Sequence, residues 1–317
     1  MVTLQILVLP FLVRVRVAQQ KKRRSYDLLF FAGMLDNSPR FRMIELDVIG
    51  STNTFLKDYR PFRPIDVTLV TAEFQTAGRG QAGNSWESRH GENLLFSLAL
   101  SALQVPATEM FVISEAIALA IREAIIPPLA QLEETLDLSR TRGEWEGTPS
   151  VTVKWPNDIY VGDSKIAGIL IENDLQGSTI TRSIIGCGVN INQQRFLFPT
   201  LIPTGSDDEK PAPTPISLRQ LLGQNTERRF VLDAIMEHFM RHYDALQRGD
   251  FCEIHAAYRA ALYRGIGLHP FRDADGSFNA AIEGVEPTGH LLLRDTTGRQ
   301  RRYAFKEVAF LEMKREK

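Results

Sequence analysis

The sequence predicts an α+β fold, in which a mixed, largely antiparallel sheet is flanked by helices and followed by a small β-barrel. Three observations lead to this prediction. The β-type segments in the middle of the chain are joined by very short connections, whereas a parallel crossover needs a dozen or more residues. Two long stretches carry apolar residues at helical spacing. Roughly the last 50 residues alternate between short strands and turns.

Taken in order, the elements follow from residue periodicity and from turn residues. The expected helices cover 51–59, 108–126, 228–247 and 253–263. The expected strands cover 67–71, 94–100, 151–154, 158–161, 165–173 and 179–190. Pro127 and Pro128 should end the second helix, because proline cannot donate to a helical hydrogen bond. We expect an exposed insertion at 131–150 and a proline-rich loop at 196–215.

Composition is that of a globular protein with room for two domains. The chain has 317 residues, of which 44% are hydrophobic and 24% are charged. Its two cysteines, Cys187 and Cys252, occur in unrelated contexts and predict neither a disulfide framework nor a cysteine metal site. No apolar run reaches the roughly 20 residues needed to span a bilayer. We therefore expect a cytoplasmic protein that does not bind the membrane.

Residues 1–42 differ from the rest of the chain in net charge. This segment carries a net charge of +6 and the remainder −7, so the total of −1 disfavours a strongly basic nucleic-acid binder. We interpret 1–42 as a basic extension, either a disordered tail or sequence upstream of a true start at Met34 or Met43. A functional basic arm is the alternative. The main domain is then expected at 43–264 and the β-barrel domain at 265–317.

The segment Gly78–Gly83 matches the G-x-G-x-x-G pattern of dinucleotide-binding loops. The pattern alone is weak evidence, because pyrophosphate binding requires a helix to open on the loop, and residues 84–91 show no helical period. We interpret the segment as a glycine loop whose backbone N–H groups surround an anion, with Arg79 as an additional planar donor. A plain tight turn is the alternative.

Three further segments combine residue types that a turn or a strand does not need. Lys154–Asp158 places a base, an aromatic ring, an amide and an acid within five residues. Lys165 opens an apolar strand, either as an edge-strand charge or as a buried cation for a phosphate. Gly186–Asn192 ends a strand with two glycines, which let a ligand approach closely, and with two asparagines that can contact polar edges.

Together these residues resemble one family, the biotin protein ligases, also called biotin–[acetyl-CoA-carboxylase] ligases. The resemblance runs from about residue 43 to the C-terminus and rests on five motifs in the family's order and spacing. These motifs are Ser51-Thr52-Asn53, Gln75 with Gly78–Gly83 and Trp86, Lys154–Asp158, Lys165–Gly168, and Gly186–Asn190. The region around Gly284–Leu293 is similar to the family's small SH3-like C-terminal domain.

The resemblance implies a fold related to class II aminoacyl-tRNA synthetases and a reaction in two steps. Biotin and ATP, with Mg²⁺, give biotinyl-5′-AMP, and the biotinyl group then passes to a lysine of a biotin carboxyl carrier domain. The residues implied in binding biotin and nucleotide are Ser51, Thr52, Asn53, Gln75, Gly78, Gly80, Gln81, Trp86, Lys154, Asn157, Gly168, Gly188 and Asn190. Lys165 and Arg79 are the implied catalytic cations, because fixed positive charge stabilises developing phosphoryl charge. Asp158 is the hypothesised base for the acceptor amine.

The loop departs from the family pattern at two positions. Gln81 and Asn84 stand where many members have arginine, and the loss of a cation there predicts weaker retention of the adenylate. His238 and His242 are one helical turn apart, but no third ligand is evident, so we predict no metal site. A homodimer is compatible with the resemblance, which implies an edge-to-edge dimer in many members.

Two other functions fit parts of the pattern. A lipoate or octanoate ligase of the same fold would also activate a carboxylate, but such enzymes usually show Arg-Arg and a glycine triplet in the ligand loop. A biotin-responsive transcriptional regulator would carry a helix-turn-helix domain of about 60 residues, whereas 1–42 shows no two-helix period. We therefore expect a monofunctional ligase without nucleic-acid binding.

Overall fold

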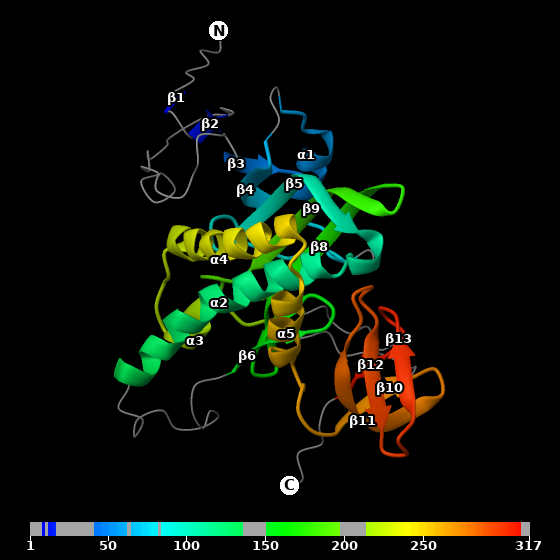
Figure 1. The fold of residues 1–317 in the computed structure, drawn as a ribbon. Helices are drawn as coiled ribbons and strands as arrows, with labels where there is room; N and C mark the ends of the chain where they lie inside the picture. The colour runs from blue at the N-terminus through cyan, green and yellow to red at the C-terminus, as the bar shows by residue number, and fades with distance from the viewer. Residues whose placement is uncertain are drawn as a thin grey trace.

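The computed structural model describes residues 8–9, 12–16, 41–61, 65–81, 84–135, 150–196 and 214–311. Within these residues the chain forms a nine-stranded sheet with helices and a separate five-stranded sheet near the C-terminus (Figure 1). The order of the large sheet is β1-β2-β3-β4-β5-β9-β8-β7-β6, and that of the small sheet is β13-β12-β11-β10-β14. None of the helices described is long and apolar enough to cross a membrane.

The strands of the large sheet, in chain order, are β1 (Val8–Leu9), β2 (Leu12–Arg16), β3 (Phe41–Ile49), β4 (Val67–Gln75), β5 (Leu94–Pro106), β6 (Val151–Lys154), β7 (Asp158–Val161), β8 (Ser164–Gln176) and β9 (Thr179–Val189). Only the pairs β2–β3 and β3–β4 are parallel among those described. From β4 to β6 every neighbouring pair is antiparallel, as the short connections predict.

Part of the basic extension belongs to this sheet. The backbone of β1 and β2 lies within 1–42, and β2 pairs with β3 in the register Val13↔Arg42. The other residues before Phe41 lie outside the described residues. The expectation of a disordered tail thus does not extend to these two short strands.

The helices are α1 (Thr52–Asp58), the 3-10 helix η3 (Ala107–Glu109), α2 (Val112–Thr135), α3 (Leu218–Leu222), α4 (Arg228–Arg248) and α5 (Cys252–Ala260). The short helix α3 is not predicted by the apolar pattern. It begins at a capping box in which Ser217 and Gln220 bond reciprocally, and it ends at Gly223 in the left-handed region.

Side-chain alternation gives the large sheet two different faces. On β9, Ile185 and Cys187 point into the core that α2 and α4 cover (Figure 1), whereas Ile184 lies in a second cluster beneath α1. Gly186 and Gly188 share the α1 face of the strand with Ile184. The α1 face therefore offers bare backbone at the level of the predicted site.

The expected end of the second helix at Pro127 and Pro128 is wrong. Helix α2 contains both prolines and continues to Thr135, with the exposed Pro127 on its outer side and Leu129 fully buried beyond them. Burial of Leu129 offsets part of the proline penalty, so tertiary packing outweighs local propensity here. The insertion expected over 131–150 thus begins in helix, and its residues 136–149 lie outside the described residues, as do 197–213 of the expected loop.

The small sheet consists of β10 (His269–Asp273), β11 (Gly276–Val285), β12 (Leu291–Asp295), β13 (Gln300–Tyr303) and β14 (Ala309–Phe310). Its turn between β11 and β12 contacts the main domain. The Trp155 indole donates to the Gly289 carbonyl at 2.9 Å, and the Phe111 N–H donates to the Pro287 carbonyl at 3.0 Å. The short strands expected after residue 265 are confirmed, while their closure into an SH3-like barrel stays a prediction.

Replacing Pro128 by alanine should stabilise the protein. The substitution restores an N–H donor for the Ala124 carbonyl, and interior proline costs about 3 kcal/mol relative to alanine. Alanine also makes the unfolded chain more flexible, which stabilises the unfolded state by about 1 kcal/mol. We therefore expect a net gain of about 1–2 kcal/mol in the free energy of unfolding, measured with urea. Pro287→Ala, in a turn, is the control and should give no gain. A lower urea midpoint for Pro128→Ala would contradict this account.

Candidate functional site

One large cavity, of about 1650 Å³, gathers nearly all the predicted site residues. It exceeds the 300–1,000 Å³ usual for one drug-sized ligand, so it has room for two small substrates. The predicted residues that line it are Ser51, Thr52, Asn53, Gln75, Arg79, Gly80, Gln81, Trp86, Lys154, Asn157, Asp158, Lys165, Gly168, Gly188 and Asn190. Gly78 does not line the cavity. Tyr303 at the end of β13 and Phe305 in the segment that follows it also line the cavity.

The start of α1 forms a buried polar wall of this cavity. Ser51, Thr52 and Asn53 are each at most 5% exposed. The Thr52 backbone N–H and hydroxyl both donate to the Gln75 side-chain oxygen, at 2.8 and 3.0 Å. The Ser97 hydroxyl lies 2.7 Å from Thr52 Oγ1 and 2.6 Å from Asn53 Oδ1. This end of the cavity thus presents neutral donors and acceptors in fixed positions.

The glycine loop is a closed hairpin. The Gly80 N–H donates to the Asn84 carbonyl at 2.6 Å, and the Trp86 N–H donates to the Gly78 carbonyl at 3.1 Å. A Cβ on Gly78 would lie 2.8 Å from the Trp86 carbonyl oxygen, closer than real side chains allow. Gly78 is therefore needed for the closure of the loop, while Arg79 and Gly80 face the cavity.

The Trp86 ring lies directly on the backbone of two neighbouring strands. A Cβ on Gly188 would be 2.2 Å from Trp86 Cε2, and a Cβ on Gly168 would be 2.9 Å from Trp86 Cζ3. These two glycines are register partners of β8 and β9. Within the described part of the chain the buried Trp86 Nε1–H has no hydrogen-bond partner. A donor left unpaired beside a cavity is what a ligand acceptor would satisfy.

Lys165 and Asp158 form the ion pair of the site. Lys165 Nζ lies 2.7 Å from Asp158 Oδ1 and 5.6 Å from the centre of the Trp86 ring, and both ion-pair partners are about one-quarter exposed. Lys165 is thus a cavity cation and not an edge-strand charge, since β7 pairs with it on one side and residues 214–216 bond its backbone on the other.

Lys154 is enclosed by aromatic rings. Its Nζ bonds the Tyr160 hydroxyl at 3.1 Å and lies 4.6 Å from that ring's centre, with Tyr263 and Phe310 also within 6 Å. Burial lowers the pKa of Lys154 despite the opposing charge of Asp158. The cation–π contacts compensate part of the lost hydration.

The two asparagines of the motifs are buried and held by backbone groups. The Asn157 amide donates to the Ile169 carbonyl, and the Asn190 amide donates to the Ile216 carbonyl at 3.1 Å. The Asn190 Oδ1 atom is buried without a partner among the described residues. Asn190 therefore retains an acceptor that a ligand amine could fill.

Ser97 and Glu172, which the motifs do not predict, bond residues that line the cavity without lining it themselves. Glu172 Oε1 lies 2.6 Å from Lys57 Nζ and 3.1 Å from Arg79 Nη2, and its Oε2 accepts from the Asn53 amide. Burial would raise the pKa of Glu172, but these donors outweigh it and lower the pKa. Alternation along β8 could have indicated Glu172, because it shares a face with Gly168 at a spacing of four.

A second feature missing from the motifs anchors the loop's far end. Asn93 and Gln193 are both fully buried, and their side chains bond each other at 2.7 Å. Gln193 also accepts from the Arg89 N–H, while Asn93 accepts from the Ile191 N–H. This pair ties the stem of the loop to the chain that follows β9, next to Asn190.

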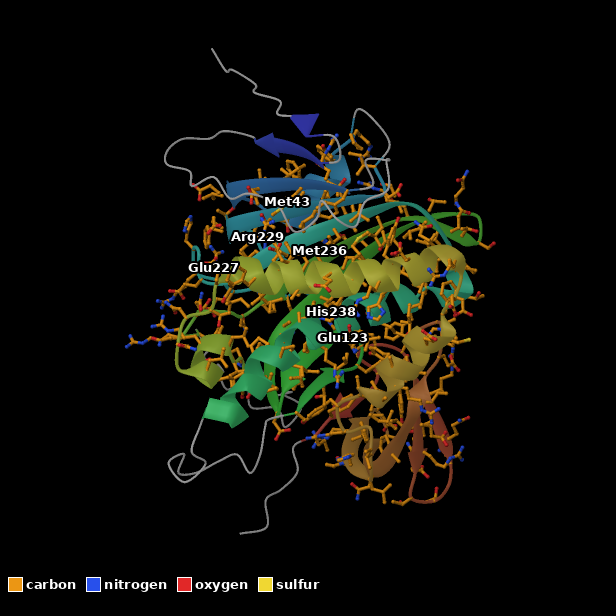
Figure 2. All side chains as sticks on the ribbon, turned by 60° about the vertical axis from the view of Figure 1, so that its left-hand side comes forward. Met43, Glu123, Glu227, Arg229, Met236 and His238 are labelled. Carbon is orange, nitrogen blue, oxygen red and sulfur yellow. The ribbon has the colours of Figure 1, made fainter. Side chains whose placement is uncertain are left out.

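His238 and His242 contact a carboxylate on the neighbouring helix. His238 Nδ1 lies 2.9 Å from Glu123 Oε2 and His242 Nε2 lies 3.4 Å from Glu123 Oε1, which joins α4 to α2 (Figure 2). Burial opposes ionisation of Glu123, but the two histidines and Arg241 lower its pKa. In the described parts of the chain no group of three or more His, Cys, Asp or Glu is arranged to hold a metal ion.

Comparison with known protein families identifies the class to which the cavity-forming part of the chain belongs. Residues 45–190 match the model of the "Biotin/lipoate A/B protein ligase family". These residues contain all five motifs and most of the cavity wall. Residues 45–190 therefore form a domain of the biotin/lipoate A/B protein ligase family.

Similarity to individual proteins extends over more of the chain. The "Bifunctional ligase/repressor BirA" of Bacillus subtilis is 28% identical over 294 residues, covering 89% of this chain and 82% of that protein. The "Biotin--[acetyl-CoA-carboxylase] ligase" of Paracoccus denitrificans is 27% identical, covering 73% of this chain and 85% of that protein. The biotin protein ligase from Aquifex aeolicus, solved with biotin and ATP, shares the fold with a TM-score of 0.59 at 22% identity, over 86% of this chain and 99% of that one.

Proposed function

We propose that this protein is an ATP-dependent biotin protein ligase. It makes biotinyl-5′-AMP and transfers the biotinyl group to one lysine of a carrier domain of a biotin-dependent carboxylase. The observation that carries the proposal is the cavity, which brings together residues of all five motifs within a family domain. The names of the relatives from Paracoccus and Bacillus support the ligase chemistry.

The two ends of the cavity suit the two substrates. Biotin has a neutral ureido ring that needs both donors and acceptors, and the wall of Ser51, Thr52, Asn53 and Gln75 offers both without a net charge. The nucleotide end offers the unpaired Asn190 Oδ1, which can accept from an adenine amine, and the Trp86 ring as a flat apolar surface. Both ends meet near Lys165.

In the first step a biotin carboxylate oxygen attacks the α-phosphorus of ATP. The bond from that phosphorus to the bridging oxygen breaks, and pyrophosphate leaves. Lys165, held 2.7 Å from Asp158, and Arg79 on the loop supply fixed positive charge where phosphoryl charge develops. Mg²⁺ would neutralise part of the triphosphate charge, and such ions are usually held by few carboxylates plus the phosphates themselves.

In the second step the acceptor lysine amine attacks the acyl carbon of the mixed anhydride. A C–N bond forms, the bond to AMP breaks, and the amine proton goes to a base. Asp158 is the proposed base because it is the acid of the motif nearest the cation Lys165. The hairpin closure of the glycine loop would keep water from the mixed anhydride until the amine arrives.

We also propose that the main domain has a class II synthetase-like arrangement, that residues 265–317 form an SH3-like barrel, and that the protein is cytoplasmic. A homodimer and the absence of nucleic-acid binding belong to the same proposal. The Bacillus relative's name includes a repressor function, so DNA binding is the discriminating property. Sequence-specific, salt-dependent binding of DNA by this chain would replace the monofunctional proposal.

The direct test is incubation of the protein with biotin, ATP, Mg²⁺ and a purified biotin carboxyl carrier domain. We expect one biotinyl group to be added to the carrier, detected by mass spectrometry, and none when ATP is omitted. Lipoate and octanoate replace biotin in parallel reactions, because they are the substrates of the alternative ligase. Carrier acylation by lipoate or octanoate, with none by biotin, would exclude the proposal.

Lys165→Ala should slow adenylate formation by about 10²- to 10³-fold, comparable to the loss of one oxyanion donor. The substitution leaves the other cavity-lining residues in place and removes the Lys165 cation proposed to act at the α-phosphorus of ATP. The rate is measured as pyrophosphate release in a single turnover, and circular dichroism verifies the fold. Near-normal pyrophosphate release would remove Lys165 from the mechanism.

Gln81→Arg should slow the release of biotinyl-5′-AMP. Gln81 lines the cavity on the glycine loop, so an arginine there adds a cation over the phosphate of the adenylate. We expect release to slow by about tenfold, corresponding to about 1.4 kcal/mol, measured by chasing the preformed complex with excess biotin and ATP. Gln81→Met is the uncharged control. An equal effect of both substitutions would contradict the charge argument.

A further inference from the structure

One carboxylate joins three elements at the edge of the cavity. Glu172 on β8 reaches Asn53 and Lys57 on α1 and Arg79 on the glycine loop. Its Oε1 lies 2.6 Å from Lys57 Nζ and 3.1 Å from Arg79 Nη2, and its Oε2 lies 3.2 Å from Asn53 Nδ2. The two oxygens therefore serve both the biotin wall and the loop.

The carboxylate is held in its charged form at a partly buried position. The Glu172 side chain is 21% exposed, less than half the exposure of either cation that it contacts. A carboxylate beside a proposed anion site would repel the ligand unless cations neutralise it. Arg79 alone is enough to balance this charge, so Glu172 can fix Arg79 without leaving net negative charge toward the cavity.

Arg79 depends on this contact for its orientation. The loop's backbone bonds fix Gly78 and Gly80 but leave the Arg79 side chain 44% exposed. Within the described chain, Glu172 is the ion-pair partner that the structure gives Arg79, and it uses only Nη2. The remaining guanidinium donors stay available for a phosphate.

We propose that Glu172 is a positioning residue, which holds Arg79 toward the phosphate of the adenylate and ties that arginine to Asn53 through one carboxylate. This inference rests on the proposed function and deepens it. Glu172 acts only through Arg79, whose proposed role at phosphorus is shared with Lys165, so its effect should be larger on retention of biotinyl-5′-AMP than on the rate of adenylate formation.

The test is a double-mutant cycle on biotinyl-5′-AMP dissociation from the full-length protein. Glu172→Gln should speed dissociation about fivefold in the wild-type background, within the range measured for ion pairs of this exposure. In the Arg79→Ala background it should change dissociation less than twofold, because the partner is already gone. Single-turnover pyrophosphate release should fall less than threefold with Glu172→Gln alone.

Two controls separate positioning from a merely structural effect. Glu283→Gln removes the carboxylate of an ion pair with Arg294 on the small sheet, away from the cavity, and should leave dissociation unchanged. Lys57→Met removes the other cation from Glu172 but no cavity-lining group, and should change dissociation less than twofold. An effect of Lys57→Met as large as that of Glu172→Gln would overturn the inference.

The remaining outcomes are also decisive. Equal effects of Glu172→Gln with and without Arg79, or no effect at all, would overturn the inference while leaving the ligase proposal intact. Failure of the wild-type protein to form biotinyl-5′-AMP would instead overturn the proposed function. If Glu172→Gln does not fold, judged by circular dichroism, Glu172→Asp enters the same cycle, since a side chain shorter by one methylene loses its reach to Arg79 while keeping its charge.

Discussion

The site depends on a small patch of the large sheet at which three neighbouring positions are glycine and therefore have no side chain. Gly168, Gly186 and Gly188 lie on adjacent strands of the α1 face, where any Cβ would collide with Asn53 or Trp86. Because these positions are bare, α1 and the end of the glycine loop approach the strands closely enough for the polar wall and the indole to meet over one cavity. The opposite face has the reverse requirement, and Ile185, Cys187 and Val189 there pack into the core with α2 and α4.

Charge in the site is arranged in advance of any ligand. Lys165 is paired with Asp158, and Arg79 is paired with Glu172. Each pairing costs part of the cation's attraction for phosphate, but it fixes the position of the charge before the substrate binds. Fixed charges need no reorganisation as the reaction proceeds, which is how electrostatic stabilisation lowers a barrier. The Lys165–Asp158 pair is only about one-quarter exposed, so water screens it less than it would a fully exposed pair.

Local patterns predict much of this structure, and contacts between distant residues account for what they miss. The antiparallel order of β6 to β9 follows from short connections, and residues of all five motifs do converge on one cavity. Alternation could place Glu172 on the site face, but its contacts with Arg79 and Asn53 are not predictable, because these partners are 93 and 119 residues away along the chain. The continuation of α2 through Pro127 is missed for a similar reason, since burial of Leu129 in the core is a tertiary effect. The short α3 has a capping box but too few apolar residues to show a period.

The segment Lys154–Asp158 connects the part of the cavity around Lys165 to the small sheet. Trp155 donates to Gly289 in the turn between β11 and β12, Asn157 holds the backbone of β8, and Asp158 binds Lys165. Five consecutive residues therefore fix the small sheet and Lys165 relative to one another. A displacement of the β11–β12 turn would act on Trp155 and, through the intervening backbone, on the Asp158 carboxylate. The small sheet thus contributes to the geometry of the site as well as to its outer wall.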